Sequence, residues 1–314
     1  MSLISEIRNF VGNHLRAHTL VHHKSPIFFW EARKYTKYLK HCQTVAPIKP
    51  SLESPIKEAV ADFKRQGVSA FRTDETASLA QSMLEKLKAE EGLGLSPWGE
   101  DGRYTLGDPF IKFPEIEALF NKALGPFFTG VMETHYAIYY MVMYKSVRNA
   151  DKPALSQLWH RDGAPGTCIN LMFCLSETSA QNGAMKCLPW QDSLEMLLND
   201  PDTLKKRLAT ASAENPTLSR LELREVKCDS YREQIEAKFQ DKIIQPTGGP
   251  GIVYAFRNNC VHAGGFPDPG HERYVCVFHI YPSCRPINLK RYVMDGAKKC
   301  NPYPKTPDEL DLLT

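Results

Sequence analysis

The sequence predicts an α+β fold, with helices first and a run of antiparallel strands after them. Residues 51–131 carry apolar side chains at helical spacing, whereas the apolar segments from residue 135 onward are short and rich in aromatic and β-branched residues. Most of these strand-like segments follow one another without an intervening helix. Such an order favours an antiparallel sandwich or barrel over a parallel sheet.

Three helices are expected ahead of the strands. The first begins at Ser54-Pro55, an N-cap followed by proline at the first helical position, and ends at Gly67. Glycine suits that end because it adopts the left-handed conformation common after a last helical turn. The second helix begins at Thr73 or Asp74, and the third covers about 114–131.

Strands are predicted over residues 136–144, 167–175, 184–188, 252–256 and 274–281. Asn182-Gly183 predicts a two-residue type I′ turn, because both central positions of that turn need positive φ. The segment 184–188 is therefore expected to be the return strand of a hairpin. Residues 190–240 are charged and keep helical spacing only in part, which predicts a helical insertion between strands.

Composition and charge indicate a soluble enzyme-sized chain rather than a nucleic-acid or membrane protein. The chain has 314 residues and a net charge of only +3, with no concentrated basic region of the kind that nucleic-acid readers carry. No segment has the apolar length of a membrane span. The nine cysteines are an odd number and include no C-x-x-C pair, so we expect reduced thiols in the cytoplasm rather than a disulfide framework.

The most informative stretch of the sequence is Trp159-His160-Arg161-Asp162-Gly163. On a strand, side chains two residues apart project from the same face, so His160 and Asp162 could reach one metal ion. His262 could supply a third ligand. Two histidines and one carboxylate on one side of a metal are the ligand set of non-haem Fe(II) oxygenases. A hydrogen-bonded pair at a strand end is the plainer alternative for His160 and Asp162.

At these residues the sequence resembles the phytanoyl-CoA dioxygenase family of Fe(II)/2-oxoglutarate oxygenases. The resemblance covers roughly residues 56–285 apart from the insertion. It is carried by four motifs: Phe63 to Val68, the W-H-x-D of residues 159–162, Gln181-Asn182-Gly183-Ala184-Met185 with Pro189, and His262 followed by Arg273.

The resemblance implies a double-stranded β-helix, a jelly-roll or cupin-like core, with N-terminal helices packed on one sheet. It implies an oxygenase domain over residues 51–290, with residues 190–240 as an insertion or lid. Residues 1–50 would then be an N-terminal helical extension, and 291–314 a C-terminal tail. The extension is the expected place for a subunit contact if the chain forms homo-oligomers.

The same resemblance implies an iron-dependent oxidoreductase that uses 2-oxoglutarate and O2 and releases succinate and CO2. His160, Asp162 and His262 would hold Fe(II) and act as the catalytic metal ligands. Arg273 would bind the far carboxylate of 2-oxoglutarate, with further cosubstrate contacts expected from Tyr144, Lys145 and Asn170. All three are candidates for binding the cosubstrate, although Tyr144 also fits an ordinary core role.

Related halogenases have a small residue where this chain has Asp162, so hydroxylation is favoured over halogenation. The leading hypothesis is a dioxygenase that hydroxylates an unactivated C–H bond of a small molecule. A nucleic-acid dealkylase of the wider superfamily is the second reading, and the weak charge bias argues against it. The third is a non-catalytic binding module that kept the barrel, which retention of all three ligand residues disfavours.

Overall fold

The computed structural model describes residues 27–89, 95–97, 102–107, 109–148, 151–153, 155–162, 167–199, 207, 210–211, 213–215 and 220–289. The first 26 residues and the predicted tail at 291–314 lie outside the described residues. So does the part of the insertion around residues 200–206. No helix in the described ranges is long and apolar enough to cross a membrane.

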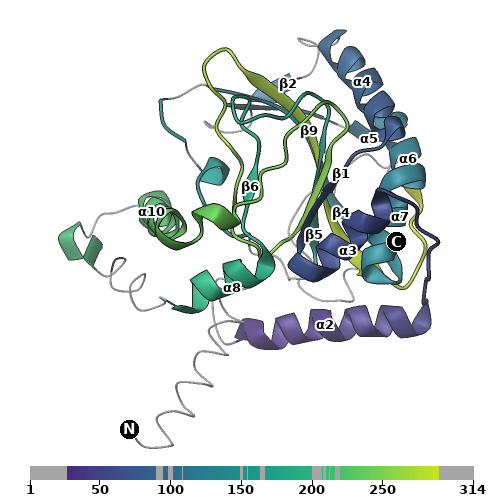
Figure 1. Ribbon diagram of the computed structural model, residues 1–314, viewed down its shortest axis with the longest axis horizontal. Coiled ribbons are helices and arrows are strands. Elements are labelled where there is room, and N and C mark those ends of the chain that lie inside the picture. The colour runs from purple at the N-terminus through teal and green to yellow at the C-terminus, as the bar shows by residue number, and fades with distance from the viewer. Residues whose placement is uncertain are drawn as a thin grey trace, which may run out of the picture.

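A seven-stranded sheet forms the centre of the molecule (Figure 1). In chain order its strands are β1 (Val68–Phe71), β2 (Leu95–Pro97), β3 (Arg103–Leu106), β4 (His135–Val147), β5 (Ile169–Cys174), β7 (Val253–Arg257) and β9 (Glu272–Ser283). Across the sheet the order is β1-β7-β5-β9-β4-β3-β2, and every neighbouring pair is antiparallel. The predicted mixture of helices with an antiparallel sheet is confirmed.

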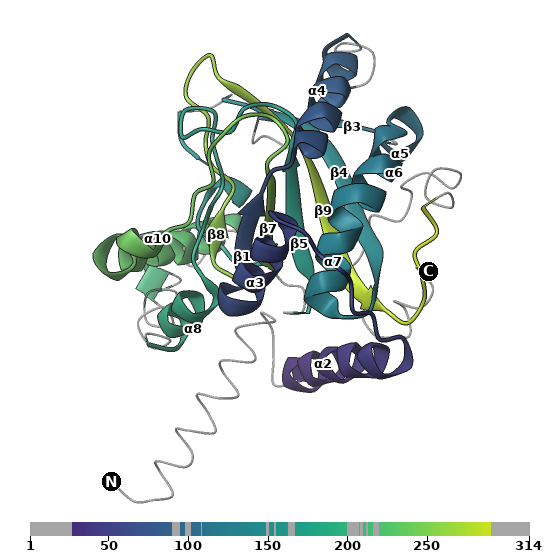
Figure 2. The same ribbon diagram turned by 45° about the vertical axis from the view of Figure 1, so that its right-hand side comes forward.

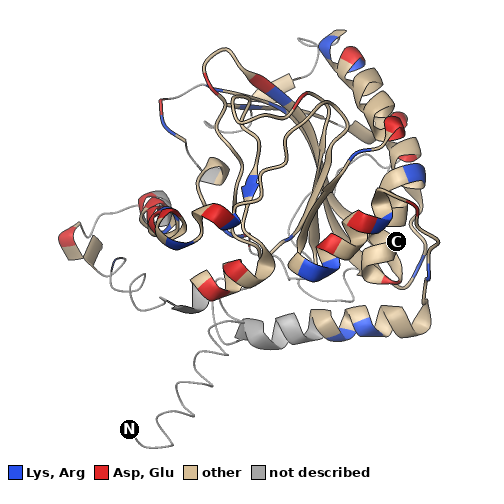
Figure 3. Cartoon of the chain, viewed as in Figure 1, with Lys and Arg blue, Asp and Glu red and all other residues tan. Residues whose placement is uncertain are grey.

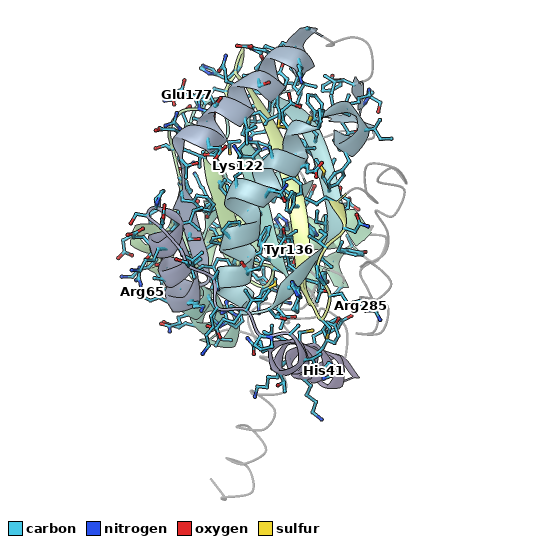
Figure 4. All side chains as sticks on the ribbon, turned by 90° about the vertical axis from the view of Figure 1, so that its right-hand side faces the viewer. His41, Arg65, Lys122, Tyr136, Glu177 and Arg285 are labelled. Carbon is cyan, nitrogen blue, oxygen red and sulfur yellow. The ribbon has the colours of Figure 1, made fainter. Side chains whose placement is uncertain are left out.

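The helices lie on both sides of this sheet (Figures 1 and 2). One face is covered by α3 (Ile56–Gln66), α4 (Asp74–Ala89), α5 (Pro109–Lys112), α6 (Glu115–Leu119) and α7 (Gly125–Met132). Figure 4 looks onto this helix-covered face. On the other side lie α8 (Trp190–Asn199) and α10 (Arg220–Lys238), while α2 (Ile27–Val45) runs along one end. Short 3-10 turns occur at Leu155–Gln157 and Gln240–Lys242.

A second, two-stranded sheet pairs β6 (Lys186–Cys187) with β8 (His262–Ala263). The predicted hairpin at Asn182-Gly183 is therefore wrong, because the segment after the turn pairs with β8 and not with β5. Gly183 has a φ of 77°, but Asn182 is not among the residues with positive φ, so a type I′ turn cannot form. Asn182 instead uses its side chain, whose Oδ1 accepts the Ser179 N–H at 2.7 Å.

The ends of the first two helices form largely as their residues predict. α3 ends at Gly67, which is left-handed (φ 72°) and donates its N–H to the Phe63 carbonyl at 2.8 Å. Its start is one residue later than expected, at Ile56. At the start of α4, the Thr73 hydroxyl accepts the Thr76 N–H at 3.0 Å, which satisfies one of the unpaired donors of a first turn.

The third predicted helix forms over residues 115–132, and within it α6 and α7 are joined by a π-helical turn over Phe120–Leu124. The Gly125 N–H bonds to the Phe120 carbonyl, five residues earlier. Pro126 is the second residue of α7 and lies in its first turn, where the missing N–H of proline is tolerated. A wider turn ahead of the proline avoids the clash that its ring would make with the carbonyl four residues before it.

Two apolar clusters occupy the two faces of the large sheet. The helix-covered face holds the larger cluster, with side chains such as Phe63, Phe120, Phe127 and Phe278 at 1% exposure or less. The opposite face holds a smaller cluster that includes Tyr144, Met172, Met185, Cys187 and Tyr254 and lies between the two sheets. Figure 3 shows Lys, Arg, Asp and Glu mixed along the outer helices, with few of them on the central strands.

Gly251→Ala is expected to destabilise the fold by about 3 kcal/mol or more, from a strained backbone and an overpacked contact. Gly251 has a φ of 91°, and a Cβ there would lie 2.5 Å from the backbone of Ala77 in α4. Urea unfolding measures the loss. Gly249→Ala is the matched control, because its Cβ would meet only the Arg72 guanidinium, at 3.9 Å. Equal stability of the two variants would contradict the prediction.

Candidate metal centre

His160, Asp162 and His262 come together between the two sheets. His160 and His262 face each other in an isolated β-bridge, in which each backbone N–H donates to the other's carbonyl at 2.8 Å. His160 thus lies in a single bridge and not in a regular strand, as the alternation argument assumed. The ligand atoms of all three residues nevertheless lie within 4.8 Å of one another.

Both imidazoles present the same nitrogen to Asp162. His160 Nε2 lies 3.6 Å from Asp162 Oδ1, and His262 Nε2 lies 3.6 Å from Asp162 Oδ2. The other nitrogens face backbone carbonyls, with His160 Nδ1 2.7 Å from Leu158 O and His262 Nδ1 2.9 Å from Cys260 O. A carbonyl oxygen only accepts hydrogen bonds, so each Nδ1 carries the proton. Each Nε2 therefore keeps a lone pair for a metal ion, the tautomer usual for ligating histidine.

Asp162 is held by Asn170 on β5, whose Nδ2 donates to Asp162 Oδ2 at 2.7 Å. Burial raises the pKa of the Asp162 carboxyl. The neighbouring His262 and His160 rings and the Asn170 hydrogen bond lower that pKa by a larger amount. The net pKa lies below its usual value, so the group is a carboxylate at neutral pH. Two imidazoles and one carboxylate, with both Nε2 atoms and the carboxylate oxygens close together, fit a divalent metal ion such as Fe(II).

The insertion supports the segment that carries His262. Ser193 of α8 accepts the Val261 N–H at 2.9 Å through its hydroxyl oxygen, and the hydroxyl donates to the Leu188 carbonyl at 3.1 Å. Tyr231 and Ile235 of α10 pack in one buried cluster with Val261. These helices lie outside the central sheet, yet they hold the backbone next to His262 in place.

The three residues line a cavity of about 800 Å³ on the inner face of the large sheet. Tyr139, Tyr140 and Tyr144 of β4 form one wall, together with apolar side chains from neighbouring strands. Pockets of roughly 300–1,000 Å³ are the usual size for small-molecule sites. The cavity therefore has room for a cosubstrate and a second small molecule beside the ligand group.

Arg273 lies on the same face of the sheet as the cavity but behind its wall. Its guanidinium donates to the carbonyls of Gly183 and Gly264, the latter at 2.8 Å from Nη2, and the residue is 2% exposed. It lines a small hollow bounded by Met172 and Met185, which also line the large cavity. Arg273 is therefore a buried cation near the cavity, and Met172 and Met185 lie between its guanidinium and the cavity.

The other cosubstrate candidates lie at different depths. Tyr144 and Asn170 both line the cavity. Lys145 follows Tyr144 on β4 and so points to the opposite, helix-covered face, where its Nζ pairs with Glu272 Oε2 at 2.8 Å. The structure therefore does not bring Lys145 together with the other predicted residues. The sequence alone does not show which face of β4 lines the cavity, so it could not predict that Lys145 lies on the other face.

Two further residues that line the cavity, Arg103 and His279, were not among the site residues predicted from the sequence. Arg103 of β3 lines the cavity, with its guanidinium carbon 5.6 Å from the centre of the Tyr144 ring. His279 of β9 lines it too, opposite Asn170 in the strand register and 5.0 Å from the Tyr140 ring. The short strand that carries Arg103 has no distinctive pattern. Only its pairing with β4 places the residue in the site.

Comparisons with known proteins find similar folds among solved structures but no match in sequence. No family model matches the sequence, and no curated protein matches it. Among solved structures, the non-heme alpha ketoglutarate dependent epimerase SnoN from nogalamycin biosynthesis is 13% identical, with a TM-score of 0.48 over 72% of this chain and 82% of that chain.

Two further solved structures are similar to a comparable degree. HygX from Streptomyces hygroscopicus, described with nickel and 2-oxoglutarate bound, is 12% identical, with a TM-score of 0.46 over 74% of this chain and 88% of that chain. EctD from S. alaskensis with bound Fe is 15% identical, with a TM-score of 0.47 over 76% of this chain and 81% of that chain. Because these TM-scores are below 0.5, the chemistry of this chain has to be argued from its own residues.

Asn170→Ala is expected to weaken metal binding by about 10–100-fold, the usual effect of removing a group that orients a metal ligand. The substitution removes the hydrogen bond that fixes Asp162 Oδ2. Anaerobic titration with Fe(II) and, separately, with Mn(II) measures the affinity. Asn170→Asp places a second anion at the same position and provides a comparison of equal size. Unchanged affinity in Asn170→Ala would contradict the positioning role.

The metal-free protein is expected to lose stability as the pH falls below neutral, in part through His279. Burial lowers the pKa of His279 to about 4, an effect that Asp162 partly offsets. The unfolded chain therefore takes up a proton near pH 6.5 that the folded chain refuses until about pH 4. The stability that this neutral group contributes is present above that window and is lost as pH falls through it.

His279→Gln should reduce that loss. Between pH 7 and pH 5 the wild type should lose about 2 kcal/mol more than the variant, the order of magnitude that linkage gives for this pKa difference. Urea unfolding of both metal-free proteins at the two pH values measures the difference, and the titration of shared groups cancels in the comparison. Equal losses in the two proteins would show that His279 does not carry the effect.

Proposed function

We propose that the chain is an Fe(II)/2-oxoglutarate-dependent dioxygenase that oxidises an unactivated C–H bond of a small molecule. The observation that carries this proposal is the convergence of His160, Asp162 and His262, each histidine with Nδ1 on a carbonyl and Nε2 directed to the carboxylate. Three protein ligands on one side of a metal leave the remaining positions open for a cosubstrate and O2. The adjoining cavity supplies the space.

In this proposal His160, Asp162 and His262 hold Fe(II), and Asn170 keeps the carboxylate in place. When bound, the iron supplies the oxidising chemistry, with 2-oxoglutarate converted to succinate and CO2. The remaining task of the protein is to orient the substrate and exclude water. The tyrosine wall and the apolar side chains around Met172 and Phe256 suit that task, because they line the cavity beside the ligand group.

Arg273 is the proposed partner of the far carboxylate of 2-oxoglutarate. The carbonyls of Gly183 and Gly264 use two of the five N–H donors of a guanidinium, so donors remain for a carboxylate. Arg273 Nε makes no hydrogen bond within the described structure. Met172 and Met185 stand between it and the large cavity, and methionine is the apolar side chain that most readily changes rotamer to admit a ligand. Tyr144 is the proposed second cosubstrate contact.

The finer fold and family assignments are part of the same proposal. The seven-stranded sheet and the small β6–β8 sheet would be the two sides of a jelly roll within an oxygenase domain at 51–290, with α8 and α10 as its lid. Membership of the phytanoyl-CoA dioxygenase-like family is supported by Trp159-His160-Arg161-Asp162 and by the distance along the chain from His262 to Arg273.

Succinate release tests the function. Purified protein, reconstituted anaerobically with Fe(II) and then given 2-oxoglutarate and air, should form succinate above the level of a metal-free sample. A metabolite library should contain compounds that raise this rate. A non-catalytic binding module would bind metal yet form no succinate with any compound, and that outcome would overturn the enzymatic assignment.

A further inference from the structure

Two cysteines from distant parts of the chain are in contact where α2 meets the end of β9. Cys42 Sγ, near the last turn of α2, lies 3.2 Å from Sγ of Cys284, the residue that follows β9. Figure 4 labels their sequence neighbours, His41 and Arg285, at the same end of the molecule. A disulfide bond joins sulfur atoms about 2.05 Å apart, so the two thiols need to approach by only about 1 Å to be bonded.

The backbone on both sides of this contact is held by one buried hydroxyl group. Thr134 Oγ1 lies 3.0 Å from the Cys42 carbonyl oxygen and 3.1 Å from the Ser283 carbonyl oxygen. The neighbouring Gln43 side chain donates from Nε2 to the Met132 carbonyl at 2.9 Å, which ties the same turn of α2 to the end of α7. Because both backbone segments are fixed in this way, the sulfur atoms can close the remaining distance by a small movement of their side chains.

Cys284 differs from the other described cysteines in its access to solvent. Of the eight cysteines in the part of the chain that the structure describes, seven are buried and Cys284 is partly exposed. Burial raises the pKa of the thiols of Cys168, Cys174 and Cys276, which keeps these groups protonated and unreactive at neutral pH. A dissolved oxidant therefore reaches Cys284 before the buried thiols.

We propose that Cys42 and Cys284 form a reversible disulfide bond that links α2 covalently to the end of β9. The oxidant is a small-molecule disulfide such as glutathione disulfide. The Cys284 thiolate attacks one sulfur of this disulfide, whose S–S bond breaks and releases one glutathione. The Cys42 sulfur then attacks Cys284 Sγ and releases the second glutathione. Each protein thiol gives its proton to a departing glutathione, so two protein thiols are oxidised and one glutathione disulfide is reduced to two thiols.

The bond holds α2 against side chains that lie behind the tyrosine wall of the large cavity. Tyr35 and Tyr38 of α2 pack in one buried cluster with Tyr139 and Tyr281. The ring centres of Tyr35 and Tyr281 are 6.2 Å apart, and those of Tyr139 and Tyr281 are 5.6 Å apart. Tyr139 also lines the cavity. Oxidation therefore fixes the position of a helix that supports one side of the candidate site.

Mass spectrometry of the full-length protein, oxidised with a large excess of glutathione disulfide, tests the proposal. Remaining thiols are blocked with N-ethylmaleimide, and chymotrypsin then cuts after Phe278, which separates Cys276 from Cys284. The wild type should yield a linked peptide pair that joins Cys42 to Cys284 and disappears after treatment with dithiothreitol. An unmodified Cys284, a glutathione adduct that remains on it, or a bond from it to any other cysteine would overturn the proposal.

Single substitutions separate the two steps of the reaction. Cys42→Ser should gain one glutathione on Cys284 and retain it, because the second sulfur is missing. Cys284→Ser should form neither the adduct nor the bond. Cys228→Ser, in α10, is the matched control and should form the bond as the wild type does. Circular dichroism checks that each variant is folded. Absence of the adduct from folded Cys42→Ser would show that the oxidant does not react at Cys284, and would overturn the proposed route.

Hydrogen exchange measures whether the bond fixes α2. The amides of residues 35–45 should exchange at least about tenfold more slowly in the oxidised wild type than in the reduced protein, since a disulfide opposes local opening of the segment that it links. The amides of α10 are the internal reference and should not change. Cys284→Ser treated with the same oxidant should keep the fast exchange. Equal exchange of α2 in the oxidised and reduced wild type would contradict its fixation by the bond.

Discussion

Asp162→Ala and His160→Ala are each expected to abolish 2-oxoglutarate turnover while leaving the fold intact. Each substitution removes one of three metal ligand candidates, and Asp162 is the one anion among the three. Neither side chain belongs to the apolar clusters that support the sheet. Asp162→Ala also removes the acceptor of the Asn170 amide, a cost of about 1 kcal/mol because the cavity can supply water in its place. Succinate release measures turnover, and thermal unfolding measures stability.

His41→Ala provides the control for these variants. His41 is an exposed residue of α2 on the outer surface (Figure 4), and it does not line the cavity. It changes the same residue type without touching the cavity, so its succinate release should equal that of the wild type. Turnover at the wild-type rate in both Asp162→Ala and His160→Ala would show that these residues do not hold the metal.

Arg273→Ala is expected to raise the 2-oxoglutarate concentration needed for half-maximal turnover by about 10–100-fold, and to change the substrate requirement much less. The range follows from a charge-assisted hydrogen bond worth about 1.5–3 kcal/mol. The variant should also lose stability, because the carbonyls of Gly183 and Gly264 lose their donor. Arg273→Lys restores the charge without the two-pronged geometry, so it should recover only part of the affinity.

Arg285→Ala is the matched control for Arg273→Ala. Arg285 follows β9, is exposed, and lies on the outer surface (Figure 4). Arg257 of β7 cannot take the place of Arg273, because its guanidinium lies 5.8 Å from the Phe63 ring and it does not line the cavity. If Arg273→Ala raised only the substrate requirement, another residue would have to bind 2-oxoglutarate.

The convergence of His160, Asp162 and His262 could be predicted from the sequence because residue type and spacing restrict it strongly. His160 and Asp162 converge even though the strand alternation used to predict it does not apply, since His160 forms only a bridge to His262. That bridge between residues distant in sequence is a tertiary feature, and no local pattern shows it. The histidine tautomers likewise depend on the carbonyls of Leu158 and Cys260, whose positions follow from the folded backbone.

Features that depend on strand pairing were harder to predict. Asn182-Gly183 has the residues of a tight hairpin, yet the chain passes to β8, because pairing partners are chosen by the whole sheet. Lys145 and Tyr144 are neighbours in sequence on opposite faces of β4. The third helix has nearly its predicted bounds, but the π-helical turn ahead of Pro126 could not be predicted from apolar spacing alone.

Anaerobic titration of Fe(II) into the protein, in the presence of 2-oxoglutarate, tests the central claim most directly. The account predicts a visible charge-transfer band that saturates at one Fe(II) per chain and is absent from Asp162→Ala, although that variant remains folded. Absence of the band in the wild type, or an equal band in Asp162→Ala, would contradict the claim that His160, Asp162 and His262 form a single iron site.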